Sequence, residues 1–237
     1  MKISKEYTGA ALVARELKKR IFQIEKSWML RWSPVSSSTE IGLSNWLRDT
    51  PIANEMPRAL FASRQTKGIG QHGRIWESPF GGVWVSAAIP CLDLKESPEL
   101  IGLAIALAIS ESLEIKKVPV KIKWPNDLIV NEKKLLGFLP RIIHRGNQPR
   151  LIKVGIGLNV FNRVPDGAIS LNQIIRITKY SLPFWSAELL ISLERALKLL
   201  SSPDKIIYEV ERRLWSDKFY DSVNKNLWKI KGINYDG

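Results

Sequence analysis

The chain has 237 residues, of which 45% are hydrophobic and 25% charged, and its formal net charge is +13. This size and composition predict a globular protein that buries its own core. No stretch reaches the roughly 18 uninterrupted apolar residues of a membrane span. The first 26 residues mix Lys, Arg and Glu and do not read as a secretory signal. We therefore expect a cytoplasmic protein with no membrane partner.

Cysteine and histidine are too few for a metal cluster. Cys91 is the single cysteine, which excludes an internal disulfide and a cysteine-based zinc site. His72 and His144 are far apart in the sequence, and neither has an obvious set of ligand partners nearby. We predict no metal site of the protein's own, and we expect any Mg²⁺ to arrive with a nucleotide.

The positive charge is concentrated in the middle of the chain. From Lys116 to Lys153, ten Lys or Arg residues stand against Asp127 and Glu132, a net charge of +8 over 38 residues. The segment from Lys205 onward is nearly balanced. Such charge binds phosphates, so an anionic small substrate, an acidic protein partner and a nucleic acid all fit it.

Hydrophobic periodicity predicts helices and strands that alternate along the chain. The expected helices are residues 10–25, 41–47, 100–113, 182–200 and 205–215. The expected strands are residues 59–63, 83–89, 120–124, 135–143, 151–160 and 227–230. This alternation of helices with hairpins predicts an α+β domain.

The ends of the chain suggest a domain division. Residues 1–35 offer room for one basic helix, and we expect no DNA-binding domain there. A strand at residues 227–230 needs a partner. We therefore predict a main domain at residues 1–217 and a short or truncated C-terminal β unit at residues 218–237.

A glycine-rich loop follows the strand at residues 59–63. Residues 65–76 read Gln-Thr-Lys-Gly-Ile-Gly-Gln-His-Gly-Arg-Ile-Trp. Such a loop lets backbone N–H groups approach an anion closely. It lacks the Gly-Lys-Ser/Thr ending of a P-loop, and it does not lead into a helix as a dinucleotide fingerprint does. By itself it is weak evidence for a function.

Two further segments carry candidate chemistry. Residues 123–127 read Lys-Trp-Pro-Asn-Asp, and Lys134 follows seven residues after the Asp. Two lysines around a carboxylate and an amide can stabilise a phosphate or carboxylate oxygen. Residues 155–160 read Gly-Ile-Gly-Leu-Asn-Val, where small residues allow a flat ring to pack closely.

In this order, the three segments resemble the biotin protein ligase family. Its catalytic domain carries a Gln-Thr-x-Gly-Arg-Gly-Arg-x-Gly-Arg-x-Trp loop, a Lys-Trp-Pro-Asn-Asp segment followed by Lys-Leu-x-Gly, and a Gly-x-Gly-x-Asn strand. The match extends from about residue 36 to residue 160. The resemblance implies an α+β fold with a mixed sheet and helices packed on one face, as in class II synthetases.

The resemblance also implies a role for each matching residue. The expected biotin-binding residues are Ser38, Thr39, Gln65, Gly68 and Gly137. The expected ATP and adenylate residues are Gly70, Gln71, Gly73, Arg74, Trp76, Asn126 and Asn159. The expected catalytic residues are Lys134, Asp127 and Lys123.

The implied activity is ATP-dependent formation of biotinyl-adenylate and transfer of biotin to a lysine of a biotin carboxyl carrier protein of acetyl-CoA carboxylase. Mg²⁺ would enter with ATP, and the partner would be the acidic carrier domain rather than a nucleic acid. The sequence does not decide whether the protein forms a homodimer. Two alternatives remain, which are a lipoate or octanoate ligase or transferase of the same fold and a non-catalytic basic nucleic-acid-binding protein.

Several positions depart from the family's motifs. Ile69 and Gln71 stand where the loop has two arginines, which removes two guanidinium groups expected to hold the phosphate. Glu40 stands where Asn commonly follows Ser-Thr in the family. Pro140 and Arg141 follow Leu139 at a place where the family usually has an extended strand that ends in Glu. The loop substitutions predict weaker retention of the adenylate.

Overall fold

The computed structural model describes residues 9–23, 25–52, 56–91, 97–176, 180–221 and 224–237. Its central element is a seven-stranded sheet in the order β1-β2-β3-β7-β6-β5-β4. The strands are β1 Met29–Ser33, β2 Arg58–Ala62, β3 Val83–Pro90, β4 Lys121–Lys123, β5 Asp127–Val130, β6 Lys133–Arg145 and β7 Gln148–Leu158. β1 pairs with β2 in parallel and all other neighbours are antiparallel, so the sheet is mixed.

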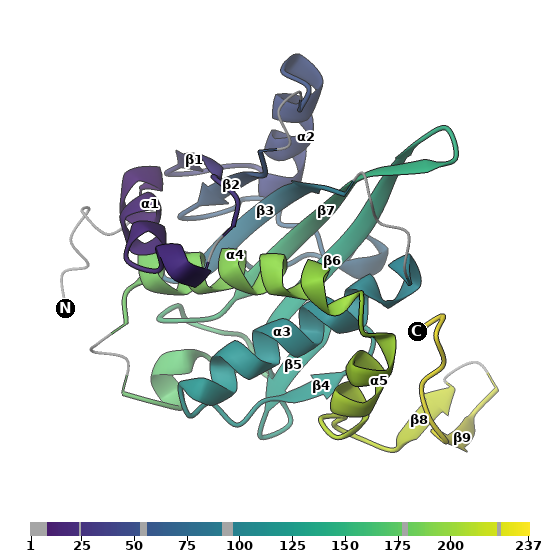
Figure 1. Cartoon of the computed structure of the whole chain (residues 1–237). Helices are drawn as coiled ribbons and strands as arrows, with labels where there is room; N and C mark the ends of the chain where they lie inside the picture. The colour runs from purple at the N-terminus through teal and green to yellow at the C-terminus, as the bar shows by residue number, and fades with distance from the viewer. Residues whose placement is uncertain (1–8, 24, 53–55, 92–96, 177–179, 222–223) are drawn as a thin grey trace.

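Four helices lie on one face of this sheet (Figure 1). They are α1 Ala10–Lys18, α3 Ile101–Ile115, α4 Leu182–Leu199 and α5 Pro203–Glu211. The sequence of α3 is apolar on nearly all sides, so the helix is buried between the sheet and its neighbours α4 and α5. The expected α+β class, with a mixed sheet and helices packed on one face, is confirmed.

Helix α2 (Thr39–Asp49) lies on the opposite face. Leu43 and Trp46 of this helix pack with Ala88 of β3 in a small core of their own, whereas Ala87 belongs to the main core. Because successive strand residues point to opposite faces, Ala87 and Ala88 assign the two cores to the two sides of the sheet. Of the five α-helices in the described residues, α2 is therefore the one on the face that carries the pocket described below.

Strands β1 and β5 were not expected from the sequence. β1 is half exposed and has no long apolar run. β5 offers only Leu128, Ile129 and Val130, between polar residues that read as a turn. The turn is in fact shorter: Asn131 and Glu132 both have positive φ, as a two-residue hairpin loop requires.

Two predicted helices are shorter in the structure than expected. α1 ends at Lys18 rather than at residue 25, because its buried residues Val13 and Leu17 have no successor beyond that point. The short 3-10 turn that follows, Ile21–Gln23, buries nothing. α5 likewise ends at Glu211, and its buried residues are Ile206 and Val210.

The expected C-terminal strand is present as β9 (Asn226–Lys229), and its partner is β8 (Lys218–Asp221). The two form a separate two-stranded sheet beside α5 (Figure 1). The division of the chain at residue 217 stays a prediction. Among the described residues, none of the helices is both long and apolar enough to cross a membrane.

Candidate functional site

A pocket lies on the face of the sheet that carries α2. Its floor is made of β6 and β7 residues whose side chains point away from the main core, and small residues dominate that floor. Register places Gly137 opposite Gly157 and Leu139 opposite Gly155. The lining residues are Ser38, Thr39, Glu40, Gln65, Ile69, Gly70, Gln71, Arg74, Ile75, Trp76, Val85, Ser86, Asn126, Asp127, Lys134, Gly137, Phe138, Leu139, Arg141, Gly155, Ile156 and Gly157.

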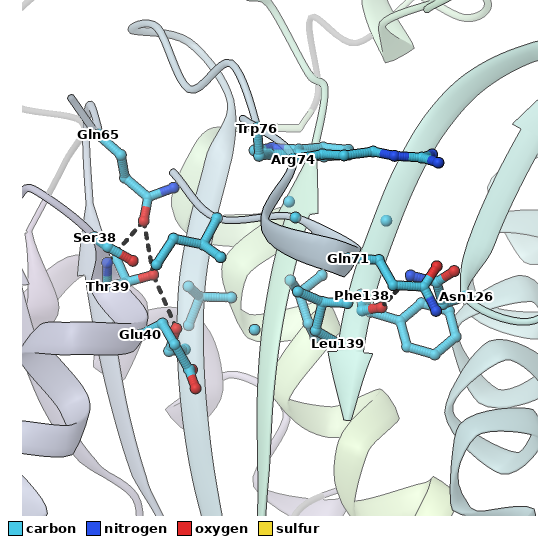
Figure 2. Close-up of a pocket in the computed structure, with 18 of the residues that line it drawn as sticks. Ser38, Thr39, Glu40, Gln65, Gln71, Arg74, Trp76, Asn126, Phe138 and Leu139 are labelled. Carbon is cyan, nitrogen blue, oxygen red and sulfur yellow. Dashed lines mark hydrogen bonds between the residues drawn. The ribbon is translucent and has the colours of Figure 1, made fainter. Parts of the chain in front are cut away.

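One end of the pocket holds a network of neutral polar groups at the start of α2. Gln65 Oε1 accepts from the backbone N–H of Thr39 at 2.7 Å and from its hydroxyl at 3.0 Å. Thr39 Oγ1 lies 2.9 Å from Ser86 Oγ, and Gln65 Nε2 donates to Ser78 Oγ at 2.7 Å. Figure 2 shows Gln65 pointing toward Thr39, with Ser38 beside them. This network holds the amide of Gln65 in one orientation.

The glycine-rich segment folds as a small hairpin over the pocket. Trp76 N–H donates to Gly68 O at 2.9 Å, and Gly70 N–H donates to Arg74 O at 2.7 Å. A Cβ at Gly68 would lie 2.3 Å from Trp76 O, so this position requires glycine. At the tip, Gly73 has a φ of 74°, a left-handed conformation that glycine adopts freely.

The indole of Trp76 lies flat on the glycine floor. A Cβ at Gly157 would come within 2.4 Å of Trp76 Nε1, and one at Gly137 within 2.9 Å of the ring. Lys134 Nζ lies 4.7 Å from the centroid of this ring, which is within cation–π range. Trp76 Nε1 is buried and has no hydrogen-bond partner among the described residues.

The other end of the pocket is charged. Lys134 Nζ from β6 lies 2.7 Å from Asp127 Oδ1 from β5, and the lysine side chain is 35% exposed. Asn126 precedes Asp127 and donates through its side-chain amide to Phe138 O at 3.0 Å, which fixes it against β6. The turn between β5 and β6 therefore brings a cation and a carboxylate together at one edge of the floor.

Residues 33–159 match the family model described as the biotin/lipoate A/B protein ligase family. This stretch is more than half of the chain. The chain belongs to this family. The resemblance read from residues 36–160 is thereby confirmed, and the catalytic domain is that of the biotin protein ligase branch.

Individual relatives agree with this placement. The bifunctional ligase/repressor BirA of Bacillus subtilis is 36% identical over 115 residues, 48% of this chain and 35% of that protein. Biotin--protein ligase 2 of Arabidopsis thaliana is 33% identical over 154 residues, 62% of this chain and 44% of that protein. The chain thus spans less than half of the length of these relatives.

A solved structure extends the comparison to the fold. The biotin protein ligase from Aquifex aeolicus in complex with biotin and ATP has a TM-score of 0.65 and 27% sequence identity. The similarity covers 87% of this chain and 88% of that one. The sheet and the helices that bear the family motifs are therefore shared over most of the chain.

Most of the predicted site residues meet in the pocket. The lining contains Ser38, Thr39, Gln65, Gly70, Gln71, Arg74, Trp76, Asn126, Asp127, Lys134 and Gly137. They come from the start of α2, the glycine-rich hairpin and strands β5 and β6. Figure 2 places Asn126 and Gln71 on one side, Ser38 and Thr39 on the other, and Trp76 with Arg74 above them. Their assigned roles stay predictions.

Lys123 is one of four predicted residues that do not line the pocket. Its Nζ lies 5.1 Å from the ring centroid of Trp215, after α5. This contact lies at the outer edge of the sheet, where β4 meets the residues that follow α5, so Lys123 does not line the pocket. Ile122 is buried in the main core and both flanking lysines are exposed. The expected catalytic role of Lys123 stays a prediction.

The other three are Gly68, Gly73 and Asn159, which lie outside the lining. Gly68 is buried at the base of the hairpin and Gly73 is at its exposed tip. Asn159 is buried, and its side-chain oxygen accepts from Asn162 Nδ2 at 2.9 Å. The side-chain oxygen of Asn159, whose amide was expected to hydrogen-bond to adenine, is therefore already an acceptor within the protein.

The structure adds lining residues that the motifs did not indicate. Ser86 is a single hydroxyl in the apolar run of β3, and this interruption was a readable signal. Arg141 and Glu40 were noted in the sequence only as departures from the family. Ile69 and Ile75 pair across the hairpin at the rim of the pocket, with exposed fractions of 42% and 83%.

Proposed function

We propose that the protein is an ATP-dependent biotin protein ligase. The observation that carries this proposal is one pocket with a neutral polar network at one end, the Lys134–Asp127 pair at the other, and an indole above a glycine floor between them. A ureido ring needs the first and an acyl phosphate needs the second. The names of the relatives and the biotin and ATP bound in the Aquifex structure support the same reading.

In the first half-reaction, a biotin carboxylate oxygen attacks the α-phosphorus of ATP, and pyrophosphate leaves. Two anions approach each other in this step, so cationic donors must stand where negative charge develops. Lys134 supplies such a donor from a strand rather than from a mobile loop. ATP would enter as its Mg²⁺ complex, because phosphate oxygens are preferred Mg²⁺ ligands.

In the second half-reaction, the amine of a carrier lysine attacks the acyl carbon of biotinyl-adenylate, an amide bond forms, and AMP leaves. Asp127 is the carboxylate nearest to this point and would orient the incoming amine. The proposed acceptor is the biotin carboxyl carrier protein of acetyl-CoA carboxylase, in the cytoplasm. An acidic carrier domain would complement the net charge of +8 between Lys116 and Lys153.

Lipoate is the competing substrate, because the family model includes lipoate ligases. The dithiolane ring of lipoate has no hydrogen-bond donors or acceptors comparable to a ureido group, so it would leave the buried Oε2 of Glu40, which has no hydrogen-bond partner among the described residues, without a donor. Unpaired buried polar groups penalise the wrong ligand. A fatty-acyl substrate such as octanoate would not need a polar network at this end of the pocket.

Pyrophosphate release from ATP and Mg²⁺ tests the proposal directly. Biotin should support release, followed by transfer to an added carrier domain, whereas lipoate and octanoate should not. Equal or faster turnover with lipoate or octanoate would assign the protein to the other branch of its family. Detection of biotinyl-adenylate with radiolabelled ATP identifies the intermediate.

A further inference from the structure

A charged pair lies beside the neutral polar network at the same end of the pocket. Lys153 Nζ from β7 is 2.8 Å from Glu40 Oε1 and donates to Ser44 Oγ at 2.9 Å. The exposed fractions of the lysine and glutamate side chains are 12% and 24%. The pair therefore joins the first turns of α2 to the floor of the pocket, and Glu40 itself lines the pocket.

Only one oxygen of the Glu40 carboxylate is used by this pair. The second, Oε2, is buried and has no hydrogen-bond partner among the described residues. It faces the space above Gly155, since a Cβ built on that glycine would lie 3.9 Å from it. A buried acceptor without a donor is costly, so an unpaired carboxylate oxygen in a ligand pocket points to a donor on the ligand.

Hydrogen bonding within the network determines which other atoms remain free. The backbone N–H of Thr39 can only donate, so Gln65 presents its oxygen there, and that oxygen also accepts the Thr39 hydroxyl hydrogen. Thr39 has then no hydrogen left for Ser86, so Ser86 must be the donor in their 2.9 Å contact. The lone pairs of Ser86 Oγ therefore stay available to a ligand.

Ser86 Oγ and Glu40 Oε2 flank the same space. The Cβ position at Gly155 is 3.7 Å from the first and 3.9 Å from the second. At the same end, the hydroxyl of Ser38 makes no capping bond to α2, and Gln65 keeps one amide hydrogen beyond its bond to Ser78. The end of the pocket thus offers two acceptors and two donors around a bare glycine.

A ureido ring has the complementary set, with two N–H donors and one carbonyl acceptor. We propose that Glu40, held and neutralised by Lys153, accepts a hydrogen bond from one ureido N–H of biotin, while Ser86 accepts from the other. This inference rests on the proposed function and names the residue that sets its specificity. The ring would lie on Gly155, and its carbonyl would face Ser38 and Gln65.

Lys153 is part of the arrangement because a carboxylate that is largely withdrawn from water is costly without a cation beside it. The cation balances the charge through Oε1 and leaves Oε2 free. A carboxylate acceptor forms a stronger hydrogen bond than an amide oxygen does. The position therefore gives this chain a charge-assisted contact where Asn is common in its family.

Equilibrium binding of biotin to the full chain tests the role of Glu40. Glu40→Gln should weaken biotin about 10- to 100-fold, the range for losing one charge-assisted hydrogen bond. Asp49→Asn is the matched control, because Asp49 is the last residue of the same helix and its side chain is 68% exposed. An unchanged dissociation constant for folded Glu40→Gln would overturn the inference.

Two methylated ligands separate ligand contact from a structural role. Biotins with a methyl group on one or the other ureido nitrogen should both bind wild-type protein at least tenfold more weakly than biotin. In Glu40→Ala, the loss of affinity caused by a methyl group on one ureido nitrogen should become several-fold smaller. The loss caused by a methyl group on the other nitrogen should stay the same. Equal penalties in both proteins would show that Glu40 is only a packing partner of Lys153.

The remaining outcomes are also assigned. If Glu40→Gln does not fold, tight binding of both methylated biotins to wild-type protein would still reject the contact. If the wild-type protein binds no biotin at all, the proposed function itself fails. If the wild-type protein binds biotin and the Glu40 variants bind it equally well, the proposed function stands and the assignment of Glu40 is wrong.

Discussion

The two ends of the pocket differ in how completely they are formed. At the end where we propose that the ureido ring binds, Ser38 and Thr39 are 1% and 4% exposed, and hydrogen bonds to Gln65 and Ser86 hold Thr39 in place. At the other end, the hairpin over Lys134 carries Ile75 at 83% exposure, and Gln71 and Arg74 are exposed as well. In our proposal, recognition of the ureido ring therefore depends on α2 and the sheet, whereas the cover over the phosphate depends on a surface loop.

This difference follows from where each end gets its backbone. The ureido end draws on the first turn of a helix and on strands in the centre of the sheet, whose hydrogen bonds are already paired. The cover is a nine-residue hairpin whose cross-strand contacts are few, and such segments open at low cost. A reactive mixed anhydride needs a cover that closes after the substrates bind.

The largest effect should come from Lys134, the cation that we propose stabilises the negative charge developing at the phosphate. Lys134→Ala should reduce adenylate formation about 10²- to 10³-fold, the range for one preorganised donor. Biotin affinity should change little, because the ureido end is separate. Pyrophosphate release and biotin binding measure the two ends independently.

Lys133→Ala is the control for that experiment. Lys133 is exposed on the same strand and does not line the pocket, so its loss should leave both measurements near wild type. If Lys133→Ala and Lys134→Ala prove equally harmless, the charged end does not carry the chemistry.

The next largest effects should come from alanine substitutions at the two β7 glycines of the floor, each of which should affect a different end of the pocket. At Gly157 a Cβ would come within 2.4 Å of Trp76, so Gly157→Ala should displace the indole and raise the KM for ATP about tenfold or more. At Gly155 the nearest atom is 3.7 Å away, so Gly155→Ala should fold with an unchanged Tm and weaken biotin instead. Identical effects of the two on biotin and ATP would contradict a pocket with distinct ends.

A substitution in the glycine-rich hairpin should strengthen its hold on the adenylate. Because Ile69 and Gln71 replace arginines, the loop would hold the adenylate phosphate mainly through backbone N–H groups, which bind less strongly than guanidinium does. We expect the adenylate to escape and biotinylate lysines of added albumin. Gln71→Arg should slow its release about tenfold.

His72 or Arg74 could instead hold the phosphate, since both belong to the same hairpin. Adenylate release that is slower than transfer to the carrier, and that Gln71→Arg does not alter, would reject the weak cover. Rapid-filtration measurement of bound adenylate after removal of free biotin distinguishes the two cases.

The smallest effect should come from Ser86→Ala at the preformed end. Removing one neutral hydroxyl costs about 0.5–1.5 kcal/mol, so biotin should bind a few-fold to about tenfold more weakly. Ser192→Ala on α4, which lies on the other face of the sheet and bonds only its own helix at Glu188 O in the described contacts, is the control. A larger loss for Ser86→Ala than for Glu40→Gln would reverse the ranking of the two acceptors.

The sequence by itself determined the family, the α+β class and half of the pocket lining. Those residues belong to motifs in which the working atoms are close along the chain. Asn126, Asp127 and Lys134 are one example, because a tight hairpin between β5 and β6 is enough to bring them together. The glycines of the 65–76 segment are another, because the hairpin closes on itself.

The tertiary structure alone decided which residues form the end of the pocket where we propose that the ureido ring binds. Glu40, Ser86 and Lys153 come from a helix and two strands far apart in the sequence, and they meet because β3 pairs with β7 beneath α2. It also turned Lys123 toward Trp215, although the motif placed it beside the site. Contacts made between strands that are distant in the sequence depend on strand order, which no local pattern in the chain encodes.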